Sequence, residues 1–435
     1  MTLLVISPDY ASHLLPLATL ATAWSDRGEH VVVATGAATD PIVRDFGFDR
    51  VELTLGRGSN AGVMRPGEQP ADEADSLRGF FDATRVGMVA TLAYQAIERL
   101  TDLMWDPVGR GRETLAVVER VRPDAILVDH LAFSARLALQ TAGIAYADVV
   151  LGHPSALPVE GEVYGYPPAW PAAFSPDPGE LEELRMLCLE VSRRFTAQWN
   201  TAAHELDPGA AEIADAFASH GAQVFYNYPA ALAAGDGRAL PPHAFLGSTR
   251  RAERVDDEIE RWIGAGEPYV YVSFGSFLSV RDDVLGRVAE ALRRLGLRAA
   301  FAIGAGDPAA LGPVPADWLV RPFLPQVRLL GSATVAVTHG GNNSVTEAVG
   351  QGVPLVVLPF STDQFAGAAA IERRGIGRAL DPNSASVEAL AEAIRATAAL
   401  PAEGRALLDE IVRTEQHKPG PQIAYDVVTG TSPTS

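Results

Sequence analysis

The residues best suited to chemistry in this sequence follow a short apolar run at positions 334–338. A histidine and two glycines occupy positions 339–341, and a helical stretch begins at Ser344. A second apolar run at 354–359 follows that helix, so the segment predicts a parallel strand–helix–strand unit. Ligands bind at the carboxyl ends of such strands, where glycines let the main chain approach a phosphate and the free N–H groups of the helix face it. The loop is therefore expected to receive an anion.

A second pair of residues lies far away in the sequence. His13 stands in the first turn of a helix that follows an apolar strand at 3–6, and Asp129 ends another strand at 124–128. Both strands belong to one predicted sheet, so the two side chains are expected to meet at its carboxyl edge. His13 would then act as a general base, and Asp129 would fix its tautomer and stabilise the charge that forms. The helix start is expected to keep the ring neutral; a histidine at a helix start is also commonly a surface or capping residue.

Taken in order, these motifs resemble the donor-binding signature of the UDP-glycosyltransferases, which have the GT-B fold. The resemblance is carried by His339-Gly-Gly-Asn-Asn-Ser-Val-Thr-Glu347 and by Asp363-Gln364 downstream. Phe323-Leu-Pro-Gln326 stands where the family usually has Trp-x-Pro-Gln, and His13-Leu-Leu-Pro resembles the family's His-x-x-Pro. A further run of the family, Val-Ser-Phe-Gly-Ser, ends at Ser276. The bacterial natural-product type of this family is the expected match.

The resemblance implies two Rossmann-like, doubly wound α/β domains that face each other across a cleft. It also implies an inverting transfer of a sugar, with His13 as the base and Asp129 as its support. In the family, the matching residues hold the nucleotide base, the ribose, the diphosphate and the sugar. The donor-binding residues expected on this ground are Ser276, Phe323, Gln326, His339, Gly341, Asn343, Ser344, Glu347, Asp363 and Gln364.

Glu347 bears on the choice of nucleotide. Many bacterial relatives that use dTDP-sugars lack this glutamate, because deoxyribose has no 2′-hydroxyl to hold, so its presence favours UDP over dTDP. The alternative is structural, because Ser344 and Glu347 have the spacing of a capping box at a helix start. A metal-dependent transferase would need an Asp-x-Asp after a strand, and the sequence has none in such a position. No metal and no cofactor besides the nucleotide sugar is expected.

The acceptor is expected to be a hydroxyl on a largely apolar small molecule, such as a secondary-metabolite aglycone. A loop at 153–174 carries aromatic residues among several prolines, which suits a ligand that slides between ring faces. The alternative is a loop that packs on its own domain. A second loop, at 56–76, is long and polar and is also expected to be functional. The candidate acceptor-binding residues are His153, Tyr164, Tyr166 and Trp170.

Composition excludes several other classes of protein. The chain of 435 residues has a net charge of −19 and a single lysine, Lys418, which argues against nucleic acid or an anionic membrane as partner. Cys188 is the only cysteine, so no internal disulfide can form. No stretch is long and apolar enough to span a membrane, and no signal peptide is visible. The composition therefore indicates a cytoplasmic protein, either a monomer or a homodimer.

Two series of alternating strands and helices predict two domains. Residues 1–246 are expected to form the acceptor domain, 247–267 a charged and solvated linker, and 268–415 the donor domain, with 416–435 crossing back to the first. Three other functions stay open: a GT-B epimerase or hydrolase, a silent nucleotide-sugar-binding partner protein and a dehydrogenase. The dehydrogenase is the weakest, because no Gly-x-Gly-x-x-Gly follows the first strand.

Overall fold

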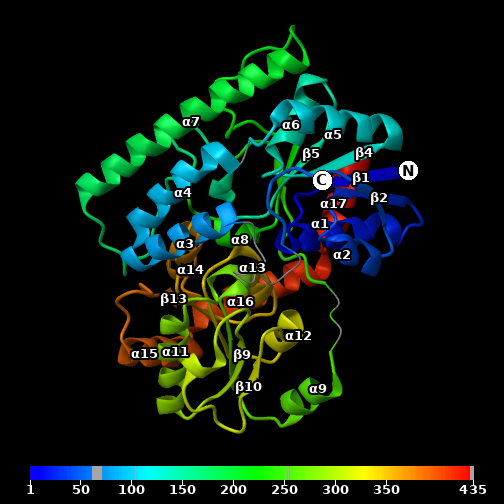
Figure 1. Ribbon diagram of the computed structural model, residues 1–435. Helices are drawn as coiled ribbons and strands as arrows, with labels where there is room; N and C mark the ends of the chain where they lie inside the picture. The colour runs from blue at the N-terminus through cyan, green and yellow to red at the C-terminus, as the bar shows by residue number, and fades with distance from the viewer. Residues whose placement is uncertain (61–70, 103, 252, 254, 432–435) are drawn as a thin grey trace.

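Two parallel sheets, one in each half of the chain, organise the computed structural model (Figure 1). The structure describes residues 1–60, 71–102, 104–251, 253 and 255–431. The first sheet has the order β3-β2-β1-β4-β5-β6-β7 and the second the order β10-β9-β8-β11-β12-β13. Both are parallel and doubly wound, so the fold class expected from the sequence is confirmed.

The first domain is built from residues before 247. Its strands are β1 (Thr2–Ile6), β2 (His30–Thr35), β3 (Asp49–Glu52), β4 (Ala125–Asp129), β5 (Ala147–Val150), β6 (Gln223–Tyr226) and β7 (His243–Phe245). Its helices are α1 (Ala11–Ser25), α2 (Asp40–Asp45), α3 (Ala71–Val86), α4 (Met88–Asp102), α5 (Pro107–Val121), α6 (Phe133–Thr141), α7 (Pro178–Leu206) and α8 (Ala230–Ala233), with a 3-10 turn η2 (Pro154–Ala156).

The second domain follows β7. Its strands are β8 (Tyr269–Ser273), β9 (Arg298–Ala302), β10 (Leu319–Arg321), β11 (Val335–Thr338), β12 (Leu355–Val357) and β13 (Gly377–Ala379). Its helices are α9 (Asp257–Gly264), α10 (Gly275–Leu278), α11 (Asp282–Leu295), α12 (Gln326–Leu330), α13 (Asn342–Gly350), α14 (Gln364–Arg373), α15 (Val387–Ala398) and α16 (Ala402–His417), with a 3-10 turn η3 (Pro308–Leu311). The last helix is α17 (Gly420–Thr429).

The central strand β1 shows why these sequences form a buried parallel sheet. Leu3, Leu4, Val5 and Ile6 are all fully buried, because helices cover both faces of the sheet. Leu3 and Val5 pack into one apolar cluster, while Leu4 and Ile6 pack into another on the opposite face. The order of the strands reverses between β1 and β4, which are parallel neighbours in the sheet. A crevice at the carboxyl ends of these strands is the usual ligand site of such a sheet.

Two segments differ from the expectation of an unstructured connection. Helix α3 begins at Ala71, within the predicted loop at 56–76, and residues 61–70 of that loop lie outside the described residues. Helix α9 lies within the predicted linker at 247–267. Its first turn is held by Asp256, whose carboxylate accepts a hydrogen bond from Ile259 N at 2.8 Å, and Ile259 itself is buried. A short amphipathic helix with a strong cap therefore forms inside a charged run.

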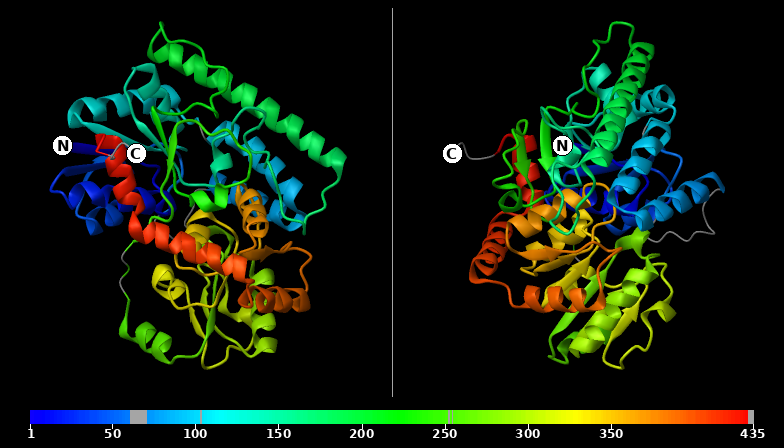
Figure 2. Two further views of the ribbon diagram at one scale, coloured as in Figure 1. Left: turned by 180° about the vertical axis from the view of Figure 1, so that it is seen from behind. Right: turned by 90° about the vertical axis from the view of Figure 1, so that its left-hand side faces the viewer.

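The end of the chain returns to the first domain. In Figure 2 (left) the red helix α16 runs along the second domain, and α17 turns up beside the N-terminal strand and helix. Helix α17 packs on α1, where the rings of Trp24 and Tyr425 meet edge to face at 5.1 Å. The Tyr425 hydroxyl donates a hydrogen bond to Glu29 at 2.9 Å. Because α17 belongs to the apolar cluster of α1, it links the two domains a second time.

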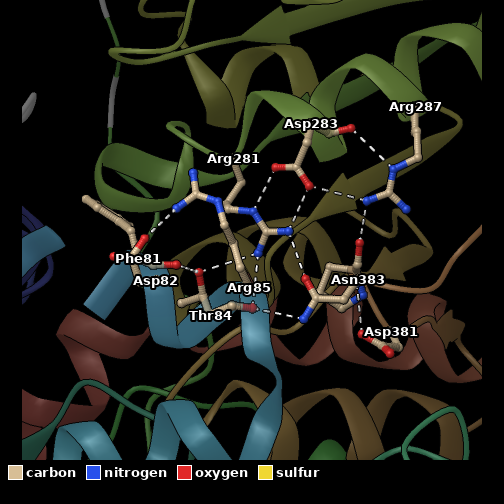
Figure 3. A network of polar contacts seen from close by, with 10 residues as sticks. Phe81, Asp82, Thr84, Arg85, Arg281, Asp283, Arg287, Asp381 and Asn383 are labelled. Carbon is tan, nitrogen blue, oxygen red and sulfur yellow. Dashed lines mark hydrogen bonds and ion pairs between the residues drawn. The ribbon is translucent and has the colours of Figure 1, made fainter. Parts of the chain in front are cut away.

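The two domains also meet directly, at a buried arginine of the second domain (Figure 3). The guanidinium of Arg281 is 1% exposed and donates to the main-chain oxygen of Thr84, near the end of α3, at 3.2 Å. Asn383 donates to the same oxygen at 2.9 Å. Asp283 holds the guanidinium through two hydrogen bonds of 2.8 and 2.9 Å. The carbonyl end of α3 is thus capped by side chains of the other domain.

Two further contacts across the cleft follow the same pattern. Asn342 Nδ2 donates to the main-chain oxygen of Asn227 at 2.9 Å, and Asn343 Nδ2 donates to that of Ser12 at 2.9 Å. In each of these contacts the second domain contributes a side chain and the first domain contributes a backbone carbonyl. The arrangement brings the start of α13 against the start of α1.

Candidate active site

His13 and Asp129 meet at the carboxyl edge of the first sheet. His13 lies in the first turn of α1, after β1, and Asp129 is the last residue of β4. His13 Nδ1 lies 2.8 Å from Asp129 Oδ2, and the side chains are 25% and 1% exposed, respectively. Asp129 Oδ1 accepts a second hydrogen bond from Leu131 N at 2.8 Å, which fixes the carboxylate. His13 lines a cavity, and the pair therefore has the geometry of a base and its support.

The pKa of His13 moves in the opposite direction to the one expected from its place at a helix start. Burial lowers the pKa of His13, but the charge and hydrogen bond of Asp129, aided by the charge of Asp363, outweigh it and raise the pKa above its ordinary value of 6.5. Two carboxylates therefore act on this ring and favour its protonated form.

The anion-binding loop lies across the cavity, at the end of β11. Helix α13 begins at Asn342, with Gly341 at its cap position and no side chain bonded to its first N–H groups. Burial lowers the pKa of His339 to about 4, so its ring is neutral near pH 7. A Cβ added at Gly341 would lie 2.3 Å from His339 Nε2. The glycine is thus required because the histidine ring lies directly against it.

Gly341→Ala is expected to lower UDP affinity by about tenfold, because the added methyl group must displace the His339 ring from the loop. Isothermal titration calorimetry measures the loss. Gly367→Ala in α14 is the matched control, since a Cβ there meets nothing within 4 Å. Unchanged UDP affinity in the Gly341 variant would show that the loop takes no part in binding the nucleotide.

Glu347 is buried in the wall of the same cavity, and its contacts decide between its two interpretations. The capping box is wrong, because α13 begins two residues before Ser344 and has no side-chain cap. Instead, Glu347 Oε1 accepts a hydrogen bond from Arg251 at 2.8 Å, and Oε2 accepts one from Gln326 at 2.6 Å. The carboxylate therefore faces the ligand space and not its own helix end.

The remaining donor-side residues lie around this carboxylate. Phe323 lines the cavity with 60% of its surface exposed, an uncovered ring face on which a nucleotide base can stack. Ser344 also lines the cavity. Gly275 packs against the His339 ring from the other side. The placement of the Ser276 side chain lies outside what the structure describes.

Asp363 and Gln364 lie at the start of α14, on the side of the cavity that faces the first domain. Asp363 Oδ2 accepts a hydrogen bond from His153 N at 2.5 Å, and burial raises the pKa of its carboxyl group. The Gln364 amide oxygen accepts hydrogen bonds from the main-chain N–H groups of Phe360 and Ser361, so it shapes its own loop. Both residues line the cavity.

The structure separates the four candidate acceptor residues into two pairs. Tyr164 and Tyr166 line the cavity, and Tyr164 stacks on Phe217 at 4.0 Å. His153 and Trp170 are not in its wall. The His153 ring packs edge to face on Tyr228 at 5.2 Å, and Trp170 joins an apolar cluster beneath the loop. The side chains of His153 and Trp170 thus pack against neighbouring side chains and do not line the cavity.

Several cavity residues carried no signal in the sequence. Helices α3 and α4 contribute Phe80, Tyr94 and Arg99, which belong to no motif and show only helical periodicity. Arg251 comes from the charged run that the composition indicated to be solvated, but its side chain is 25% exposed and bonds Glu347. The volume of the cavity is about 760 Å³, and both domains line it. Acid–base and anion-binding groups thus face one shared space.

Comparison with known proteins agrees with this geometry. A family model described as UDP-glucoronosyl and UDP-glucosyl transferase matches residues 190–401. Over these residues the chain is similar to this family, and its two doubly wound parallel sheets form the GT-B fold. An uncharacterized UDP-glucosyltransferase, YdhE of Bacillus subtilis, is 29% identical over 181 residues, which are 40% of this chain and 41% of the relative. Demethyllactenocin mycarosyltransferase of Streptomyces fradiae is 30% identical over 198 residues, 45% of this chain and 40% of the relative. The matched stretch thus spans less than half the length of either relative.

Solved structures match this chain over nearly its whole length. The match to the glycotransferase of kitacinnamycin covers 99% of each chain, with a TM-score of 0.65 and 22% identity. The glycosyltransferase VinC, solved in complex with dTDP, also covers 99% of both chains, with a TM-score of 0.67 and 16% identity. At these identities the likeness establishes the fold. No helix in the described part of this chain is both long and apolar enough to cross a bilayer.

Proposed function

We propose that this chain is an inverting glycosyltransferase that moves a sugar from a nucleotide sugar, UDP-linked in preference to dTDP-linked, to a hydroxyl of a largely apolar small molecule. The observation that carries the proposal is the shared cavity. It is lined by the His13–Asp129 pair from the first domain and by the His339 loop with Glu347 from the second. An acceptor hydroxyl and a nucleotide sugar can therefore meet in one cavity.

In the proposed reaction, His13 Nε2 takes the proton of the acceptor hydroxyl while Asp129 stabilises the imidazolium. The acceptor oxygen forms a bond to C1 of the sugar from the face opposite the diphosphate. The bond from C1 to the phosphate oxygen breaks, and the nucleoside diphosphate leaves with the electron pair, so the anomeric centre is inverted. The free N–H groups at the start of α13 stabilise the charge on the leaving group. These N–H groups would neutralise the developing negative charge, as a metal ion does in metal-dependent transferases.

The acceptor class rests on the cavity wall and on relatives. Leu15, Leu77, Phe80 and Tyr164 give the first-domain side an apolar surface with polar groups between. Demethyllactenocin mycarosyltransferase and an oleandomycin glycosyltransferase are among the relatives. A secondary-metabolite aglycone is accordingly the acceptor we propose, with the cytoplasm as its place of reaction and a monomer or homodimer as the active form.

The nucleotide preference rests on Glu347. Its carboxylate lines the same cavity as the uncovered ring of Phe323, so in the proposed binding mode the base stacks on that ring and the ribose reaches the carboxylate. Two of the solved relatives, VinC and the spinosyn rhamnosyltransferase SpnG, carry thymidine diphosphate, which has no ribose 2′-hydroxyl. The two nucleotides therefore need to be compared directly on this chain.

Glu347→Ala is expected to weaken UDP binding by about 1.5–3 kcal/mol, roughly one to two decades in Kd, because two hydrogen bonds to the ribose are lost. Binding of dTDP should change less, and calorimetry measures both. Glu388→Ala is the control, since Glu388 is an exposed residue of the same domain that pairs with Arg294. Equal losses for both nucleotides, with a lower melting temperature, would assign Glu347 a purely structural role.

The activity itself is tested by mass spectrometry of a donor panel. UDP- and dTDP-sugars are incubated with the chain, with and without an extract of candidate aglycones. The expected product is a glycoside that forms only with acceptor present, at the opposite anomeric configuration to the donor. Donor consumed without any acceptor would indicate a hydrolase or epimerase. Nucleotide binding with no consumption would indicate a silent binding protein.

A further inference from the structure

Arg251 lies outside both sheets, between the two domains, yet its side chain lines the same cavity as Glu347. Its Nη1 donates to Glu347 Oε1 at 2.8 Å, and its Nη2 donates to Glu253 Oε1 at 2.8 Å. The carboxylates of Glu347 and Glu253 are 5% and 10% exposed. The guanidinium therefore lies between two nearly buried acids, one on α13 and one on its own segment.

The second oxygens of both acids are also bonded. Glu347 Oε2 accepts from Gln326, whose own oxygen accepts from the Tyr271 hydroxyl at 3.2 Å. Glu253 Oε2 accepts from the main-chain N–H of Arg328 in α12 at 3.1 Å. A continuous chain of hydrogen bonds thus runs from β8 through the carboxylate of Glu347 to the linker. Each side chain in it has its geometry fixed by the next.

This arrangement controls the charge on Glu347. Burial raises the pKa of Glu347, and the nearby charge of Glu253 raises it further, while Arg251 and the hydrogen bond from Gln326 lower it. Arg251 is the cation among the groups that act on this carboxylate. On α16, Glu415 lies near Arg250 and Gly350 at the other end of α13, away from this site.

A ribose offers two hydroxyl donors, and an ionised carboxylate oxygen can accept more than one hydrogen bond. Glu347 can therefore keep its hydrogen bonds from Arg251 and Gln326 while it accepts further hydrogen bonds from the ribose hydroxyls, provided that its carboxylate stays ionised. We infer that Arg251 is a positioning residue of the donor site, which holds the Glu347 carboxylate charged and aimed at the ribose, so that the linker between the domains takes part in the choice of UDP over dTDP. This inference rests on the proposed function, because it assumes that the ribose of the nucleotide sugar binds at Glu347.

The test is calorimetry of UDP and dTDP binding to the full chain between pH 5 and pH 9. In the unaltered chain, UDP affinity should fall as the pH drops through the pKa of Glu347, because a protonated carboxyl group accepts fewer hydrogen bonds. In Arg251→Gln the cation is gone and that pKa is higher, so the loss of affinity should begin at a higher pH, by about one pH unit. At pH 7 the variant should bind UDP about tenfold more weakly, whereas dTDP binding should change less than about threefold.

Three further variants separate this role from a structural one. Arg251→Lys keeps a cation and should recover part of the UDP affinity. In a Glu347→Gln background, Arg251→Gln should add little further loss, because it acts through Glu347. Arg250→Gln is the matched control: Arg250 is the neighbouring arginine and donates to Gly350 O, so UDP binding should stay unchanged.

Equal losses of UDP and dTDP in Arg251→Gln, or an unmoved pH dependence, would overturn the role of Arg251 and leave the glycosyltransferase proposal standing. Tighter UDP binding in that variant would also overturn it, since Arg251 would then compete with the ribose. Failure of the unaltered chain to bind either nucleotide would overturn the proposed function and this inference together.

Discussion

His13→Ala is expected to lower kcat by about 10²–10⁴-fold, the usual contribution of a positioned general base. Without the imidazole, the acceptor hydroxyl loses the base that takes its proton, although the His339 loop is untouched. UDP affinity should accordingly change by less than about twofold, since the loop at His339 belongs to the other domain. Steady-state kinetics with the acceptor found in the donor panel gives kcat, and calorimetry gives the affinity.

His30→Ala is the matched control for this variant. His30 also pairs with an aspartate, Asp49, at 2.7 Å, but both side chains are more than half exposed and His30 begins its strand at the edge away from the cavity. Its removal should leave kcat unchanged. A His13→Ala enzyme that keeps most of its turnover would show that His13 only occupies the start of α1.

Asp129→Asn is expected to lower kcat by about 10²–10³-fold, because the amide keeps the ring nearly in place but does not stabilise the imidazolium.

The pH profile of kcat/KM should move as well. Activity needs neutral His13, and Asp129 raises its pKa, so the acid limb of kcat/KM should lie above pH 6.5 in the unaltered enzyme. Loss of the carboxylate leaves burial to lower the pKa, so the limb should shift to lower pH in the variant.

The double variant His13→Ala, Asp129→Asn should be little worse than His13→Ala alone, since the two residues act as a unit. Asp49→Asn is the control, because it removes the same charge from the aspartate that pairs with the exposed His30. Additive losses, or an acid limb that stays where it is, would show that Asp129 acts on the fold and not on the base.

The sequence was sufficient for much of the fold, for physical reasons that particular elements illustrate. β1 is apolar at every buried position because helices cover both faces of its sheet, and the alternation of such runs with helices indicates a parallel sheet. The pairing of His13 with Asp129 could be predicted because adjacent parallel strands end at the same edge. The His339 loop could be predicted because its glycines mark a close approach of the main chain.

What the sequence could not indicate are contacts between segments distant along the chain. Arg251 stands in a run of charges that is typical of solvated linkers, and only the fold brings it to Glu347. The loop at 153–174 shows the same limit. From the sequence, its tyrosines and its tryptophan are equally suited to contact a ligand. Only the packing shows that Tyr164 lines the cavity and that Trp170 joins an apolar cluster instead. The direction of the pKa shift of His13 depends on the balance between burial and two carboxylates, which spacing in the sequence cannot supply.

Arg281, Asn383, Asn342 and Asn343 of the second domain each donate a hydrogen bond to a backbone carbonyl of the first domain. Every amino acid supplies such a carbonyl, so substitutions at Thr84, Ser12 or Asn227 should keep these four hydrogen bonds and remove only longer side-chain contacts, from Arg281 to Thr84 Oγ1 at 3.4 Å and from Asn227 to Asn343 at 3.5 Å. The side chains of the first domain can therefore change at these points while its contacts with the second domain persist. Chimeras that join this second domain to the first domain of a distant relative should retain these four hydrogen bonds wherever the backbone path at the three points is kept.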